Sequence, residues 1–197
     1  MGLFDSLRQI VAPKPAPAPP PARARPSPAA WAALAGALSG DDTAVEAEVR
    51  AAVEQPARYL DAFRDRLSQR GIERAEQVEP VIALIDALLA RRLAFGLDWK
   101  ETFDGFFAGC ESVLPPQAAD SAAFRALRSR PWPKDANFAV SLSELALGLR
   151  EAGIELFLLD NESDEYNLAP VALDRVDAVR TAIAALENPR VVRQIAA

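Results

Sequence analysis

The sequence predicts an α+β fold: a mostly helical domain with a small antiparallel β-sheet, preceded by an N-terminal amphipathic helix and a proline-rich linker. Three observations predict it. Apolar residues recur every three or four positions along most of residues 29–151, as on one face of a helix. Two β-type segments, 154–160 and 166–173, flank a short polar turn. Eight of the 16 prolines fall within residues 12–28.

Residues 1–11 form the predicted amphipathic helix, because their apolar side chains repeat with helical spacing. A helix of three turns is marginal in water on its own, so we expect it to dock on a surface. Protein, a membrane surface and the chain's own domain are the three alternatives. The expected docking face consists of Leu3, Phe4, Leu7 and Ile10.

Residues 12–28 form the predicted linker, since proline fixes φ and removes backbone donors, which favours an extended, semi-rigid spacer. Residues 29–197 then form a single α+β domain, a length that suits one hydrophobic core.

The first half of this domain is predicted to be helical throughout. Helices are expected to begin at Ala29, at Asp41 or Asp42, at Pro56 and at Glu73, the third ending at Gly71. The fourth extends to Leu93. Its second half, VIALIDALLA, is apolar almost all round and is expected to be the central buried helix. Pro80 either kinks this helix or begins a new one.

The second half of the domain mixes helices and strands. A short extended segment at 93–99 precedes helices at 100–113, 117–129 and 138–151, the last with Val140 facing inward. The strands IELFLLD and YNLAPVAL follow, and Pro170 places the second toward a sheet edge. Asp174 caps a final helix.

Composition excludes several kinds of chemistry. The chain has no histidine, which rules out histidine-dependent nucleophile pairs and histidine metal sites. Its one cysteine, Cys110, sits among phenylalanines and is expected to be a buried apolar side chain. No apolar run is long enough to span a membrane, and no signal peptide is evident, so a cytoplasmic location is expected.

The charge of the chain is unevenly divided. The net charge is −6, which argues against nucleic-acid binding. Residues 1–28 carry a net charge of +3, which leaves −9 for the rest. Such a division favours a tethered binding protein over an enzyme.

The turn between the two predicted strands is the first candidate site. Asp160, Glu162 and Asp164 alternate like the first ligands of a calcium loop, and Tyr166 follows them. The pattern then fails, because Glu165 stands where such a loop needs glycine. A solvated hairpin turn is the favoured interpretation, a loose divalent-metal site the alternative.

Asp98, Trp99 and Lys100 form the second candidate site, where an extended segment meets a helix. The favoured interpretation is structural: Asp98 caps the helix, Trp99 is core and Lys100 pairs with Asp104. The alternative places Lys100 in a hydrophobic pocket as a base or Schiff-base nucleophile.

These two segments, LDWKE at 97–101 and FLLDNESDEYNLAPV at 157–171, resemble an uncharacterised bacterial family, the domain of unknown function 6630. The resemblance covers roughly residues 75–190 and implies a small bacterial α+β domain, without established catalytic residues. The hairpin also resembles that of the Smi1/Knr4 immunity-protein superfamily, although the usual Trp and Gly features are not clear here.

We therefore expect a bacterial cytoplasmic protein-binding module, an adaptor or immunity-like protein, tethered through its N-terminal helix. A protein partner is expected, with no cofactor and no catalytic residue, and the oligomeric state stays open. The alternative is a divalent-metal or carboxylate-dependent enzyme that uses residues 160–165.

Overall fold

The computed structural model describes residues 26–133 and 138–195. The predicted helix 1–11, with its docking face, and the linker up to residue 25 lie outside the described residues. Within them, the fold prediction is confirmed: the domain is mostly helical and contains one four-stranded antiparallel sheet.

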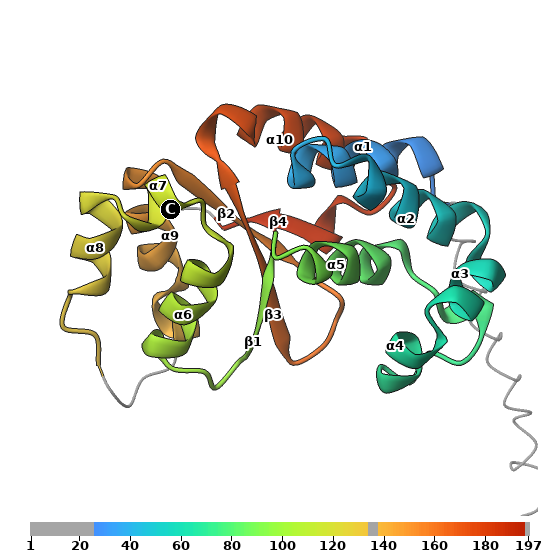
Figure 1. Cartoon of the computed structure of the whole chain (residues 1–197), viewed down its shortest axis with the longest axis horizontal. Coiled ribbons are helices and arrows are strands. Elements are labelled where there is room, and N and C mark those ends of the chain that lie inside the picture. The colour runs from blue at the N-terminus through green and yellow to red at the C-terminus, as the bar shows by residue number, and fades with distance from the viewer. Residues whose placement is uncertain (1–25, 134–137, 196–197) are drawn as a thin grey trace, which may run out of the picture.

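The sheet forms the middle layer of the domain, with helices on both faces (Figure 1). Its strand order is β1-β3-β2-β4, and every neighbouring pair is antiparallel. The strands are β1 (Phe95–Asp98), β2 (Ile154–Leu159), β3 (Glu165–Ala172) and β4 (Val192–Gln194). Strand β4 was not predicted, because three residues are too few to show an alternating pattern.

The hairpin β2–β3 was predicted, but the position of its second strand was wrong. Strand β3 lies inside the sheet, between β1 and β2, and not at an edge. Pro170 is tolerated there because β1 pairs with β3 only as far as Leu168. Beyond that residue β3 has β2 as its only neighbouring strand, so a missing N–H interrupts no second ladder.

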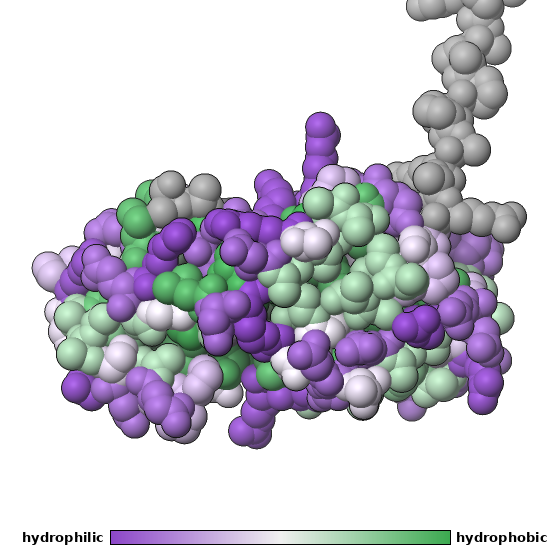
Figure 2. Space-filling model, turned by 90° about the horizontal axis from the view of Figure 1, so that it is seen from above, coloured by the Kyte–Doolittle hydropathy of each residue, from purple (hydrophilic) through white to green (hydrophobic). Residues whose placement is uncertain are grey.

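One face of the sheet is covered by α1 (Pro28–Ser39), α2 (Thr43–Glu54), α5 (Pro80–Ala90) and α10 (Val176–Ala184). Their apolar side chains pack on Phe157 and Leu159 of β2 and Ala169 and Val171 of β3. Helix α5 is buried as predicted. From above, α1 and α10 show weakly hydrophobic side chains with hydrophilic ones around them (Figure 2).

The opposite face is covered by α6 (Phe103–Val113), α7 (Pro116–Ala119), α8 (Ala122–Arg128) and α9 (Leu142–Glu151). Leu156 and Leu168 project here, since alternate strand residues face opposite sides. Gly109 lets α6 approach β1 closely: a Cβ there would lie 2.3 Å from the Phe95 ring.

The remaining helices, α3 (Pro56–Ala62) and α4 (Arg64–Gln69), form a small satellite cluster at the outer end of α2 and α5. A single helix was predicted here. It breaks because the backbone of Phe63 leaves the helical region, at φ −122° and ψ 27°.

Other predicted boundaries also need correction. The first half of the helix expected at 73–93 is a single 3₁₀ turn, Ala75–Gln77. Of the two alternatives for Pro80, the new helix is confirmed: α5 starts there, where a missing N–H costs nothing. The stretch 117–129 is divided between α7 and α8. The stretch 138–151 begins as a 3₁₀ turn, which leaves Val140 80% exposed and not inward.

No helix among the described residues is long and apolar enough to cross a membrane.

Two buried ionisable side chains, Cys110 and Tyr59, determine how we expect stability to depend on pH. Burial raises the pKa of the Cys110 thiol, which is fully buried as predicted, and of the Tyr59 phenol. Between the unfolded and folded pKa values, the unfolded chain has lost a proton that the folded chain keeps. We therefore expect the free energy of unfolding to fall by about 1.4 kcal/mol per pH unit for each group, above about pH 9 for Cys110 and above about pH 10 for Tyr59.

Urea denaturation of the full chain at a series of pH values measures this loss. Cys110→Ala should make the slope just above pH 9 shallower, whatever its effect on stability at neutral pH. An unchanged slope in that variant would show that Cys110 does not contribute.

Candidate functional site

The two segments singled out in the sequence meet at one end of the sheet. Strands β1 and β3 pair so that Asp98 lies opposite Glu165 and Leu97 lies opposite Tyr166. This pairing brings the end of β1 beside the β2–β3 turn, although the two segments are some sixty residues apart in sequence.

A hollow of about 390 Å³ lies at this meeting point, and we call it the sheet-end hollow. It is open to solvent and lined by both segments and by a residue of β4. The lining residues are Trp99, Leu158, Asp160, Ser163, Asp164, Glu165, Tyr166 and Arg193. Four of the predicted residues, Trp99, Asp160, Asp164 and Tyr166, therefore line the hollow, while Asp98, Lys100 and Glu162 are not among its lining residues.

Trp99 is the main apolar feature of the hollow. The structural interpretation expected this side chain in the core, but it is 45% exposed. The ammonium of Lys100 lies 4.7 Å from the centroid of the Trp99 ring, in place of the expected ion pair with Asp104. Lys100 is itself exposed, which also contradicts the alternative of a lysine in a hydrophobic pocket.

Asp98 orders the segment that carries Trp99. Its Oδ1 accepts a hydrogen bond from the Lys100 N–H at 2.8 Å and so closes a tight turn after β1. The prediction that Asp98 caps the next helix is wrong. Thr102 caps α6 by accepting from the N–H of Gly105.

The acidic turn on the other side of the hollow is folded by its own polar side chains. Asp160 Oδ1 accepts from the Glu162 N–H at 2.9 Å, and Ser163 Oγ accepts from the Glu165 N–H at 3.2 Å. Glu162 has a φ of +58°, a left-handed conformation that is uncommon for a residue with a side chain. Asp164 projects from this turn and is exposed.

Arg193 and Tyr166 complete the hollow. Arg193, from the strand that the sequence did not reveal, donates through Nη2 to Asp160 Oδ2 at 2.9 Å. The half-buried Tyr166 ring meets the buried Phe138 ring edge-on, with centroids 5.3 Å apart. The tyrosine therefore joins the hollow to the aromatic core beneath it.

Among the described residues, no three Asp, Glu or Cys side chains lie close enough together to hold one metal ion.

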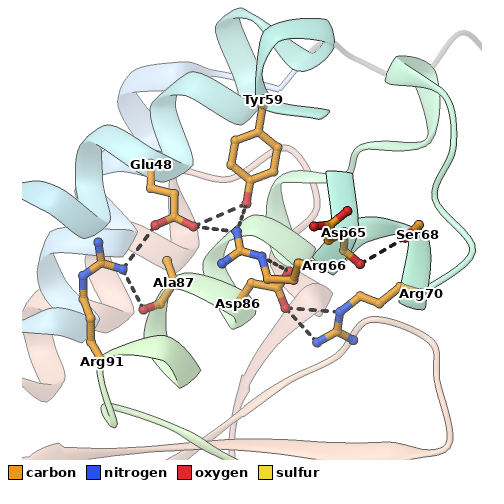
Figure 3. Close-up of polar contacts among 9 residues, drawn as sticks. All are labelled: Glu48, Tyr59, Asp65, Arg66, Ser68, Arg70, Asp86, Ala87 and Arg91. Carbon is orange, nitrogen blue, oxygen red and sulfur yellow. Dashed lines mark hydrogen bonds and ion pairs between the residues drawn. The ribbon is translucent and has the colours of Figure 1, made fainter. Parts of the chain in front are cut away.

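A partly buried polar network, absent from the sequence-based predictions, lies between α2, α3, α4 and α5 (Figure 3). Arg66 is at its centre. Its Nη2 lies 2.7 Å from both Glu48 Oε1 and Tyr59 Oη, and its Nε lies 3.1 Å from Asp86 Oδ2. Burial lowers the pKa of Arg66, but the hydrogen bond to Glu48 and the charges around it raise that pKa by more.

Two further arginines complete the network. Arg70, just after α4, donates through Nη2 and Nε to Asp86 Oδ1 at 2.7 and 3.1 Å. Arg91, just after α5, lies 3.2 Å from Glu48 Oε2. Each carboxylate thus faces two guanidinium groups, and the network fastens α3 and α4 to the rest of the domain. A lone aspartate, Asp86, in an otherwise apolar helix was the only sequence signal for it.

Comparison with known proteins assigns the domain to a family. Residues 30–192 match the family model described as Domain of unknown function (DUF6630). The match includes both segments on which the resemblance was based and begins well before residue 75, where the resemblance was placed. No match was found among curated proteins or among solved structures. The chain therefore belongs to the DUF6630 family.

Proposed function

We propose that this chain is a protein-binding module, of an adaptor or immunity-like kind, and that the sheet-end hollow receives a basic segment of its partner. The observation that carries the proposal is an exposed tryptophan beside a tyrosine and three carboxylates in one hollow. The few residues that supply most of the binding energy of a protein interface are often tryptophan or tyrosine.

Charge supports a basic partner. Asp160 is paired with Arg193, but Asp164 and Glu165 are exposed at the rim of the hollow. The residues after position 28 carry a net charge of −9. Complementary potentials steer association and exclude wrong partners.

The first prediction from this proposal concerns partner affinity. The full chain is used to capture a partner from cells of its source organism, and the purified partner is then titrated against variants. Trp99→Ala should weaken binding by about thirtyfold, or about 2 kcal/mol, as expected for a central aromatic contact. Asp164→Lys should slow association and reduce its dependence on salt.

Glu151→Lys is the matched control for the charge reversal. Glu151 is also exposed, but it ends α9, at the opposite end of β2 from the hollow. This variant should bind as the wild type does. Equal binding by Trp99→Ala, Asp164→Lys and the wild type would contradict the proposal, as would failure to capture any protein.

A further inference from the structure

The sheet-end hollow is the first of three adjoining hollows on the surface of the domain. A second hollow, of about 590 Å³, shares Asp160 and Arg193 with the sheet-end hollow. A third, of about 530 Å³, shares Asn188 and Val191 with the second. Because neighbouring hollows share lining residues, the three lie in a row over the surface, which we call the path.

The third hollow lies where the N-terminal segment joins the domain. Pro26, the first described residue, is part of its wall, next to Trp31 of α1. The rest of the wall combines apolar side chains with three carboxylates, those of Glu76, Glu79 and Glu187. Residues 1–25 therefore leave the domain at one end of the path, and the sheet-end hollow lies at the other.

The charge of the N-terminal segment is complementary to both ends of this path. Residues 1–25 carry four basic side chains against one acid, a net charge of +3. Carboxylates line the third hollow at one end and the sheet-end hollow at the other. The segment also carries the apolar side chains Leu3, Phe4, Leu7 and Ile10, which match in kind the exposed Trp99 and the half-buried Tyr166 of the sheet-end hollow.

The linker is long relative to the width of the sheet. Residues 12–25 would span about 43 Å as an extended polyproline helix, at roughly 3.1 Å per residue. The part of the path from β4 to the end of β1 crosses the four strands, which are together about 15 Å wide at roughly 4.8 Å between neighbouring strands. A stiff spacer of this length favours a distant landing point over one directly beside Pro26.

We infer that residues 3–11 bind in the sheet-end hollow of their own chain, with Leu3, Phe4 and Leu7 against Trp99 and Tyr166 and with Arg8 near Asp164. This inference rests on the proposed function, because it makes the N-terminal segment a competitor of the protein partner. A tether of this kind gives an effective concentration of about 1 mM, so an intrinsic Kd near 0.1 mM keeps the hollow about nine-tenths occupied.

A spin label tests the placement in the full chain. Gly2→Cys introduces a labelling site, and the native Cys110 does not compete because it is fully buried. The indole N–H signals of Trp99 and Trp31 then report on two places, the sheet-end hollow and the third hollow. The label should abolish the Trp99 signal and leave the Trp31 signal intact.

Matched variants sharpen the test. Adding Phe4→Glu to the labelled chain should restore the Trp99 signal, because a carboxylate there removes an apolar contact and repels Asp164. Loss of the Trp31 signal in place of the Trp99 signal would overturn the placement, and so would two unaffected signals. Loss of the Trp99 signal in an unlabelled chain mixed with a labelled one would show binding between two copies and would also overturn the inference.

The partner separates this inference from the proposed function. In the unlabelled chain without Gly2→Cys, Phe4→Glu should raise partner affinity by about tenfold over the wild type, since it frees a hollow that was nine-tenths occupied. If the label leaves the Trp99 signal unchanged but Trp99→Ala still weakens partner binding, the inference is wrong and the proposed function stands. If the label abolishes the Trp99 signal but Trp99→Ala leaves partner affinity unchanged, the proposed function is wrong.

Discussion

Asp86→Ala should lower the free energy of unfolding by about 3–5 kcal/mol, the largest effect we expect from a single charged residue in this domain. Asp86 is 4% exposed and is the common partner of Arg66 and Arg70. Removing its carboxylate leaves Arg70 without its ion-pair partner among the described residues and leaves Arg66 with Glu48 and Tyr59. An uncompensated charge in a partly buried position is more costly than the pair itself is stabilising.

Urea denaturation of the full chain measures this effect, with Asp61→Ala as the matched control. Asp61 pairs with Arg64 at the surface, where both side chains are mostly exposed, so its loss should change stability by less than about 1 kcal/mol. The double variant Asp86→Ala/Arg70→Ala should be less destabilised than the sum of the two single variants. Simple additivity would contradict the pairing.

Phe106→Ala should cost about 3–5 kcal/mol for a different reason, the loss of a large side chain from a closed core. The Phe106 ring is fully buried and lies 5.5–6.0 Å, between centroids, from the rings of Phe95, Phe107 and Phe138. Alanine would leave a cavity between α6 and the sheet. Close packing of Gly109 on Phe95 prevents α6 from moving inward to fill it.

Thermal and urea denaturation of Phe106→Ala measure this effect. Leu147→Ala, a change on the outer side of α9, is the matched control. Leu147 is 47% exposed, so its truncation should cost under about 1 kcal/mol. Because Phe138 joins Phe106 to Tyr166, the large-cavity variant should also weaken partner binding at the sheet-end hollow. Similar stability losses in the two variants would contradict this account of the core.

Local signals were sufficient to predict most elements of the fold. The spacing of apolar residues located α1, α2, α6 and the β2–β3 hairpin, because each buries one face with a regular period. One prediction failed at Phe63, although the residues around it continue the helical spacing. Phe63 interrupts a helix that its sequence would continue, and its ring lies 4.2 Å from the Arg66 guanidinium and 4.6 Å from the Tyr59 ring.

The candidate site was predicted in its parts but not as a whole. Each segment was recognisable from its acids and its aromatic residue, while their meeting depends on the β1–β3 register, which no local pattern specifies. Arg193 was missed because its strand has only three residues. The Arg66 network was missed because it joins residues from four helices, and charged residues on helices usually face solvent.

The distribution of the two faces along the chain has a consequence for how the protein folds during synthesis. Helices α1, α2 and α5 all precede the first strand, yet the sheet that they cover and the helix α10 beside α1 come from residues 95–194. The Nη2 of Arg175 donates to the Gly36 carbonyl across 139 positions of sequence. Contacts of such long range form slowly. The sheet-facing sides of the first helices therefore stay uncovered until the strands are made, and we expect the nascent chain to expose apolar surface during that time.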